Sequence, residues 1–120
     1  LVVDDEPDIL TALSKDLTDA GYEVLTALTA KEGIRKAKEN LPDLILMDIL
    51  LSDMGGGDAV KMIKAYPELS KKPVIFLTGI VTPEEGERSM EINVNDGWYI
   101  AIAKPYDKEY LVSKIQEVLK

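Results

Sequence analysis

Short runs of aliphatic residues recur along the chain, and most of them end at a polar or charged residue. Residues 44–47 and 74–77 are continuous aliphatic runs, as is typical of central strands covered on both faces of a parallel sheet. Residues 1–3 resemble the end of such a strand, and residues 22–26 alternate apolar and polar side chains. Residues 98–103 are rich in aromatic and β-branched side chains. The pattern therefore predicts five strands.

The segments between these runs carry apolar residues at helical spacing, and most have a clear start signal. Pro7 suits the first position of a helix, because its missing N–H would be unpaired there, and Gly21 suits the end of that helix. Thr29 and Glu32 have the spacing of a capping box. The expected starts of the three later helices are Asp58, Thr82 and Asp107.

Five strands alternating with five helices predict an α/β fold. We expect the flavodoxin-like, doubly wound (βα)5 arrangement, a five-stranded parallel sheet in the order 2-1-3-4-5 with helices on both faces. The chain has 120 residues, so we expect residues 1–120 to form a single domain. Because only three apolar residues precede the first acid and a buried strand needs about five, we expect the start of the first strand to be missing.

The amino-acid composition limits the binding partners and the reactions that this chain can have. Lys and Arg number 14 against 22 Asp and Glu, and the resulting net charge of −8 disfavours direct binding to nucleic acid. The chain has neither Cys nor His, so any chemistry must use carboxylates, hydroxyls and amines. No apolar run approaches the roughly 20 residues that span a bilayer, so we expect no membrane association and a cytoplasmic location.

Polar residues follow four of the predicted strands. Asp4 and Asp5 end the first strand, Asp48 the third, Thr78 the fourth and Lys104 the fifth. The carboxyl ends of parallel strands meet at one edge of a sheet, where ligands bind. Three carboxylates close together repel unless a cation relieves them, and an acidic cluster without His or Cys fits Mg²⁺ or Mn²⁺. The pattern predicts a phosphoryl site with a carboxylate nucleophile.

At this point the sequence resembles the receiver domains of response regulators, the CheY-like superfamily of bacterial two-component signalling. The resemblance covers nearly the whole chain, and each motif that carries it follows the expected strand. These motifs are Asp4-Asp5-Glu6, Pro42-Asp43-Leu44-Ile45-Leu46-Met47-Asp48, Leu77-Thr78-Gly79 and Lys104-Pro105.

The resemblance implies a role for each acidic residue of the site. Asp48 corresponds to the phosphoacceptor. Asp5 and Asp48 would bind Mg²⁺ directly together with the backbone carbonyl of Leu50, and Asp4 would act largely through water. Mg²⁺ is therefore the expected cofactor, with Mn²⁺ as an alternative.

The resemblance also assigns the residues around the phosphoryl group. Thr78 would be the switch hydroxyl, Gly79 would leave room beside the phosphate, and Lys104 would contact a phosphoryl oxygen. The bond from Lys104 to Pro105 is expected to be cis. Gly56 matches the glycine of the loop after the acceptor strand.

As the resemblance implies, the phosphoryl donor is a sensor histidine kinase or a phosphotransfer protein. Phosphorylation would shift the surface of the fourth helix, fifth strand and fifth helix (α4-β5-α5 in that count), which controls an output domain or protein that the sequence does not identify. A homodimer that forms on phosphorylation is a further candidate. The domain would catalyse only its own phosphorylation and dephosphorylation, so it is not expected to be an enzyme.

Some positions depart from the family pattern. Ala101 stands where the family usually has an aromatic switch residue, and Tyr99 on the same face is the candidate to replace it, although it lies about 7 Å farther along the strand. Ser52 stands where Pro is common. Leu50 and Ile80 cannot orient an attacking water, which predicts a long-lived acyl phosphate.

Two alternative functions remain open. A receiver-like interaction module that does not cycle would account for Ala101. A haloacid-dehalogenase-like phosphohydrolase also combines strand-end Asp, Thr and Lys with Mg²⁺, but its nucleophile lies on the first strand in an Asp-x-Asp pattern. The glycines at 55–57 are interpreted as a flexible turn, because no Gly-Lys-Ser or Gly-Lys-Thr follows them as in a Walker loop.

Overall fold

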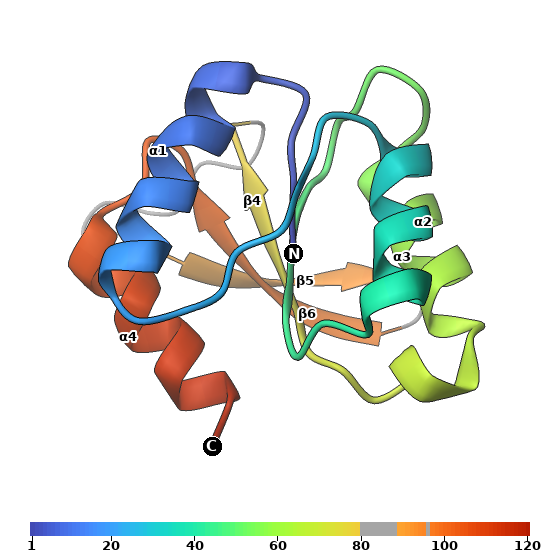
Figure 1. The fold of residues 1–120 in the computed structure, drawn as a ribbon. Helices are drawn as coiled ribbons and strands as arrows, with labels where there is room; N and C mark the ends of the chain where they lie inside the picture. The colour runs from blue at the N-terminus through green and yellow to red at the C-terminus, as the bar shows by residue number, and fades with distance from the viewer. Residues whose placement is uncertain (80–88, 96) are drawn as a thin grey trace.

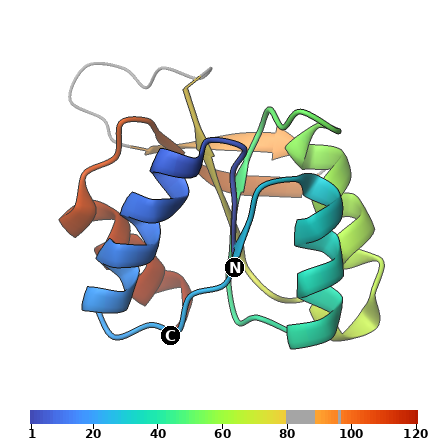
Figure 2. The same cartoon turned by 45° about the horizontal axis from the view of Figure 1, so that its top comes forward.

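The structure is a computed structural model that describes residues 1–79, 89–95 and 97–120. These residues form three layers, with a central sheet between two pairs of helices (Figures 1 and 2). α1 and α4 cover one face of the sheet, and α2 and α3 cover the other. The elements are β1 (Val2–Val3), α1 (Pro7–Asp19), β2 (Thr26–Ala27), α2 (Ala30–Asn40), β3 (Ile45–Asp48), α3 (Gly56–Lys64), a 3-10 turn (Pro67–Leu69), β4 (Val74–Thr78), β5 (Ser89–Val94), β6 (Gly97–Ala103) and α4 (Lys108–Val118).

The sheet has the order β2-β1-β3-β4-β6-β5. Its first five strands in this order are parallel to their neighbours, so the predicted doubly wound order 2-1-3-4-5 is confirmed for them. The prediction of a sheet with five strands is wrong at one edge, where β5 pairs antiparallel with β6. Only two residues separate these strands, and a parallel crossover needs a dozen or more, so an antiparallel hairpin is the only pairing open to them.

Strand β5 lies in the part of the chain that follows the helix start expected at Thr82. Thr82 itself lies outside the described residues. In β5, Met90, Ile92 and Val94 pack against the core on the α2 and α3 side, whereas Glu91 and Asn93 are exposed. This alternation with a period of two is the usual pattern of a half-buried strand.

The core forms two clusters, one on each face of the sheet. The α1 and α4 side is built from aliphatic residues of those helices and of the sheet: Val2, Leu10, Leu13, Leu17, Leu46, Ile75, Leu77, Ile102, Leu111 and Ile115. The α2 and α3 side has Met47 and Phe76 at its centre, with Ile34, Val60 and Ile63 from the helices. Successive strand residues point to opposite faces, so continuous runs such as 74–77 supply both clusters.

Three of the predicted helix starts are confirmed. Pro7 is the first residue of α1. The side chain of Thr29 accepts a hydrogen bond from the backbone N–H of Glu32 at 3.1 Å, and Asp107 accepts one from Tyr110 N at 3.0 Å. Among the described helices, none combines the length and the apolar character that crossing a bilayer requires.

The predicted start of α3 at Asp58 is wrong, and so is the interpretation of residues 55–57 as a flexible turn. Gly55 is the N-cap, and Gly56 and Gly57 already belong to the helix. The backbone N–H of Gly56 donates to Ile49 O at 2.7 Å, which ties the first turn of α3 to the end of β3. The early start reflects this long-range contact, which a local capping preference cannot indicate.

Candidate functional site

The polar residues at the ends of four parallel strands meet at one edge of the sheet. Asp4 follows β1, Asp48 ends β3, Thr78 ends β4 and Lys104 follows β6. Asp4 and Thr78 are each 1% exposed and Asp48 is 6% exposed, so three polar side chains are buried at this edge. The parallel register places Asp48 beside Leu77, and Thr78 beside Ala103.

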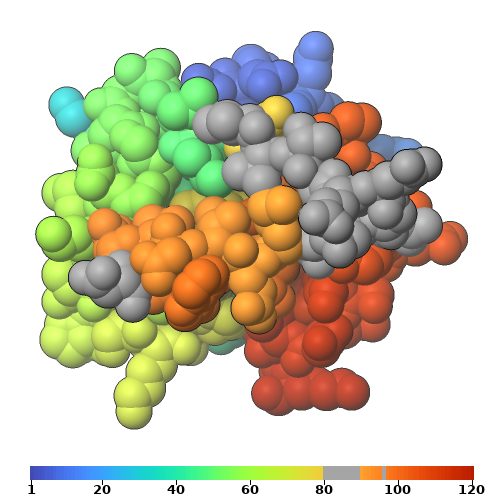
Figure 3. Space-filling model, turned by 180° about the vertical axis from the view of Figure 1, so that it is seen from behind, coloured from blue at the N-terminus to red at the C-terminus, as the bar shows by residue number. Residues whose placement is uncertain are grey.

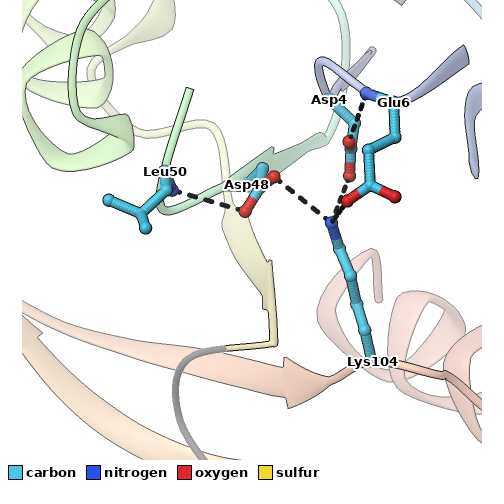
Figure 4. A network of polar contacts seen from close by, with 5 residues as sticks. All are labelled: Asp4, Glu6, Asp48, Leu50 and Lys104. Atoms are coloured by element: carbon cyan, nitrogen blue, oxygen red, sulfur yellow. Dashed lines mark hydrogen bonds and ion pairs between the residues drawn. The ribbon is translucent and has the colours of Figure 1, made fainter. Parts of the chain in front are cut away.

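Lys104 connects the acidic side chains of this edge (Figure 4). Its Nζ donates to Asp4 Oδ2 at 2.6 Å and to Asp48 Oδ2 at 3.2 Å, and lies 3.9 Å from Glu6 Oε1. Its backbone N–H donates to Thr78 O at 3.0 Å. One amine therefore bridges two buried carboxylates that come from β1 and β3, and its own backbone is held by β4.

Burial and charge act in opposite directions on the pKa values at this site. Burial raises the pKa of Asp48 above its usual value, and the negative charge of Asp4 adds to this, whereas the positive charge of Lys104 opposes it. For Lys104 burial alone would lower the pKa, but the hydrogen bond to Asp4 and the charges of Asp48 and Asp4 raise it. The two carboxylates thus favour the charged form of Lys104, and the charge of Lys104 favours the ionised form of Asp48 against the effect of burial.

The acidic residues at the end of β1 form a group that fits a hard divalent cation. One carboxylate oxygen from each of Asp4, Asp5 and Glu6 lies within 4.8 Å of the others. Together with Asp48, the described residues of this edge bring four carboxylates and one amine, that of Lys104, so among them the negative charge is not balanced. Oxygen ligands with excess negative charge are what Mg²⁺ and Mn²⁺ prefer.

Glu6 was not predicted as a site residue, although it is part of the motif that carries the resemblance. Its backbone N–H donates to Asp4 Oδ1 at 2.9 Å, which fixes the carboxylate of Asp4 opposite Lys104. Its exposed side chain lies near the amine of Lys104. The sequence contained this signal, because Glu6 follows Asp4 and Asp5 directly.

The loop after Asp48 packs closely against the end of β3. Leu50 N lies 3.3 Å from Asp48 Oδ1, to which it donates a long hydrogen bond, while the Leu50 side chain is 61% exposed. At Gly56 a Cβ atom would lie 2.1 Å from Asp48 O and 3.0 Å from Ile49 Cα. Only a glycine allows α3 to approach the backbone of Asp48 this closely.

Two further features of the edge concern the space beside Thr78 and the chain direction after Lys104. Among the residues that the structure describes, no heavy atom lies within 4 Å of the position that a Cβ would take at Gly79. The peptide bond between Lys104 and Pro105 is cis, which is the isomer that the resemblance implies. The Tyr106 hydroxyl then donates to Asp16 Oδ2 on α1 at 2.7 Å.

Ala101 and Tyr99 lie on the α2 and α3 side of β6. Ala101 is 1% exposed, and its cross-strand neighbours are Phe76 on β4 and Met90 on β5. Tyr99 is half-buried, and its ring meets Phe76 edge to face with ring centres 5.4 Å apart. Lys64 Nζ lies 5.7 Å from the centre of the Tyr99 ring. Tyr99 is thus packed by its own neighbours, and its role as a switch surrogate stays a prediction.

The fold and this edge define a doubly wound α/β protein with an acidic, lysine-bridged site at the carboxyl ends of its parallel strands. The family model described as "Response regulator receiver domain" matches residues 1–116. The chain therefore belongs to the response regulator receiver domain family. It is a receiver domain of the two-component type, and phosphorylation and Mg²⁺ binding are general properties of that family.

Several relatives are similar over the whole chain. The transcriptional regulatory protein KdpE of Mycobacterium tuberculosis is 30% identical over 120 residues, which are 100% of this chain and 50% of KdpE. Protein PilH of Pseudomonas aeruginosa is 33% identical over 119 residues, 99% of this chain and 95% of PilH. The chain thus spans about half the length of the curated regulators such as KdpE that it matches, but nearly all of PilH.

The fold is also similar to that of solved receiver structures. The structure of the chemotaxis protein CheY4 of Vibrio cholerae superimposes with a TM-score of 0.83 at 32% sequence identity, covering 98% of this chain and 94% of that one. The family match favours a receiver domain over the haloacid-dehalogenase-like alternative.

Proposed function

We propose that Asp48 accepts a phosphoryl group and that the resulting acyl phosphate switches the domain between two states. The observation that carries this assignment is the bridge from Lys104 Nζ to Asp48 Oδ2 at 3.2 Å and to Asp4 Oδ2 at 2.6 Å. Asp48 ends a central strand and is 6% exposed, and its carboxylate contacts both Lys104 and the backbone N–H of Leu50 in the loop that follows.

The donor is a sensor histidine kinase or a phosphotransfer protein. An oxygen of Asp48 attacks phosphorus and forms an O–P bond, while the P–N bond of the donor phosphohistidine breaks and its electron pair stays on the imidazole. Lys104 Nζ lies within reach of Asp48 and would pair with an oxygen of the transferring group. The domain catalyses its own phosphorylation and dephosphorylation and has no separate substrate.

The metal is Mg²⁺, with Mn²⁺ able to replace it. Asp5, Asp48 and the backbone carbonyl of Leu50 would bind it directly, and Asp4 would act through water. When bound, the ion offsets the negative charge of the transferring oxygens. The grouped carboxylates of Asp4, Asp5 and Glu6 support this site, because they leave negative charge that Lys104 alone does not balance.

Thr78 and Gly79 would respond to the phosphoryl group once it is bound to Asp48. Thr78 is buried at the end of β4, and no atom of the described residues occupies the space beside Gly79, where phosphoryl oxygens would lie. A hydrogen bond from Thr78 to one of these oxygens would shift the end of β4 and the neighbouring surface. We propose that residues 1–120 act in this way as a single cytoplasmic receiver domain that controls an output domain or protein.

The test is the intact mass of the protein after incubation with acetyl phosphate and Mg²⁺. We expect one phosphoryl adduct per chain, lost in Asp48→Asn and without metal. Asp43→Asn is the matched control, because Asp43 is an exposed acid before β3 that pairs with Lys72 at 3.4 Å. An adduct that survives in Asp48→Asn would overturn the assignment, and many turnovers of the donor per chain would indicate a phosphohydrolase.

A receiver-like module that does not cycle is the second candidate, and Ala101 favours it. The residue is fully enclosed between Phe76 and Met90, so no aromatic side chain can turn inward there. The same mass measurement decides between the two. The absence of an adduct in the wild-type protein, together with an unchanged spectrum on adding beryllofluoride, would favour the module.

A further inference from the structure

Strand β5 is the last strand at one edge of the sheet. Its inner side pairs with β6 along its whole length, from Ser89 opposite Ile102 to Val94 opposite Gly97. On its outer side, no strand of the described part of the chain pairs with it. Figure 3 shows the hairpin of β5 and β6 at the surface, between the α3 side and the α4 side of the molecule. As far as the described residues go, the outer side of β5 therefore presents a row of backbone groups that another strand can pair with.

In its own sequence and in its pairing with β6, β5 lacks the usual features that prevent an edge strand from pairing. Edge strands are commonly short, charged, interrupted by proline or bulged. β5 has six residues, with Glu91 as its only charge and no proline or lysine, and its register with β6 is continuous. It is therefore suited to pair with a further strand.

The pattern of apolar and polar residues in β5 reads the same in both directions from Ile92. Met90 and Val94, two residues away on either side, are apolar and point to the α2 and α3 side. Glu91 and Asn93, one residue away, are both exposed on the opposite face. In an antiparallel pair, residues directly opposite each other point to the same face. A second copy turned by a two-fold axis at Ile92 thus places Met90 opposite Val94, and Glu91 opposite Asn93.

The neighbouring registers are worse. A two-fold axis at Asn93 keeps the faces matched and the charges apart, but it pairs only residues 92–94 of each strand, whereas the axis at Ile92 pairs residues 90–94. A shift by one residue would put the apolar side chains of one copy on the polar face of the other. A two-fold axis at Glu91 keeps the faces matched but sets the two Glu91 carboxylates against each other, and like charges directly opposite are destabilising. The register centred on Ile92 avoids both, because each Glu91 meets a neutral Asn93.

We propose that β5 pairs with β5 of a second copy of this chain, antiparallel and centred on Ile92, so that the two six-stranded sheets become continuous. The occupant is a second copy because the strand is complementary to itself in both apolar pattern and charge. A net charge of −8 on each copy opposes association, so the dimer is weak and strengthens with salt. This inference goes beyond the proposed function, because pairing at β5 needs no reaction at Asp48.

The test changes the charge opposite Glu91. Because of the two-fold symmetry, residue 93 of each copy lies opposite Glu91 of the other, so each dimer has two such pairs. Asn93→Lys would make both of them pairs of opposite charge, and Asn93→Asp would make both of them pairs of like charge. We expect about a two- to thirty-fold tighter dimer for Asn93→Lys and a weaker one by a similar factor for Asn93→Asp. Sedimentation equilibrium over a concentration series measures both. Because Trp98 is the only tryptophan, is 69% exposed and lies opposite Asn93, its fluorescence gives a second readout.

Matched controls separate a local effect from a change of net charge. Gln116 is exposed on α4, away from the hairpin, so Gln116→Lys and Gln116→Asp change the net charge equally. The pairing is supported if the substitutions at residue 93 change the dimer affinity much more than the same substitutions at residue 116 do. A chain that stays monomeric in wild type and Asn93→Lys, or a dimer equally sensitive to both positions, overturns it. Phosphorylation of the same samples is measured separately, so a failure of the dimer proposal can be told apart from a failure of the proposed phosphorylation of Asp48.

Discussion

Gly56→Ala is expected to damage both the stability of the domain and its phosphorylation site. The added Cβ would lie 2.1 Å from Asp48 O, a backbone atom that cannot rotate away as a side chain can. Either the end of β3 or the first turn of α3 has to move by about 1 Å or more. The same movement lengthens the 2.7 Å hydrogen bond from Gly56 N to Ile49 O.

The magnitude follows from these two losses. Overpacking a well-filled core costs about 1–3 kcal/mol, and losing a hydrogen bond of this kind costs about 1 kcal/mol. We therefore expect the free energy of unfolding to fall by about 2–4 kcal/mol, out of the roughly 5–15 kcal/mol that a domain possesses. The displacement reaches Asp48 and Leu50, so phosphorylation should slow as well.

Urea denaturation of three adjacent alanine variants measures this effect. At Gly55 the nearest atom to a Cβ is Asp58 Oδ2 at 3.9 Å, so Gly55→Ala should change stability by less than about 1 kcal/mol. At Gly57 a Cβ would lie 2.7 Å from Val94 Cγ1, a side-chain atom that can shift, so Gly57→Ala should be intermediate. If Gly56→Ala were as stable as Gly55→Ala, the close approach of α3 to Asp48 would be refuted.

Three further predictions concern the site and its surroundings. Burial raises the pKa of Asp48, so around that pKa the folded state binds more protons than the unfolded state. The stability of the wild type therefore falls as the pH rises from the unfolded value of 3.8 through the folded pKa. In metal-free buffer, Asp48→Asn should be more stable than the wild type at neutral pH, and this difference in stability should shrink in acid. Tyr106→Phe removes the 2.7 Å hydrogen bond to Asp16 and should cost about 1 kcal/mol of unfolding free energy. Leu50→Gln should shorten the lifetime of the acyl phosphate by about tenfold or more, because an exposed amide at this position can orient water.

For each of these three predictions, a particular experimental outcome would contradict the reasoning. For Asp48, a stability difference that does not change with pH would show that the charge is not responsible. For Tyr106, the double variant with Asp16→Ala should cost less than the sum of the two single changes, and strictly additive costs would exclude the hydrogen bond as the cause. For Leu50, a wild-type acyl phosphate that decays within minutes would refute the long lifetime. Ile80, the other residue behind that prediction, lies outside the described residues.

The site could be predicted from the sequence because its residues are placed by topology alone. Once the aliphatic runs are assigned to parallel strands, their carboxyl ends must share one edge. Asp4, Asp48, Thr78 and Lys104 each follow such a run, so their convergence needs no knowledge of side-chain packing. The ion pairs of Lys104 with both Asp4 and Asp48 depend on rotamers and required the structure.

The features that the sequence prediction missed depend on contacts between distant segments. Asp58 has the better capping side chain, yet the N-cap of α3 is Gly55, three residues earlier, because Gly56 can touch the backbone of Asp48. β5 follows a strong helix-start signal at Thr82, which masked the alternation of the next apolar residues. A short alternating segment becomes a strand only when a neighbouring strand pairs with it, and β6 does so here through a two-residue connection.

Ala101 and the extra strand are two aspects of the same structural change. In the row across the sheet, Phe76 on β4, Ala101 on β6 and Met90 on β5 lie side by side, so a small residue is enclosed between two large ones. An aromatic side chain at position 101 would compete with Met90 and Phe76 for this space, because Ala101 is already 1% exposed. The chain therefore departs from the family's aromatic pattern at the point where its sheet gains the antiparallel β5, and the space beside Ala101 is filled by a strand instead of a ring.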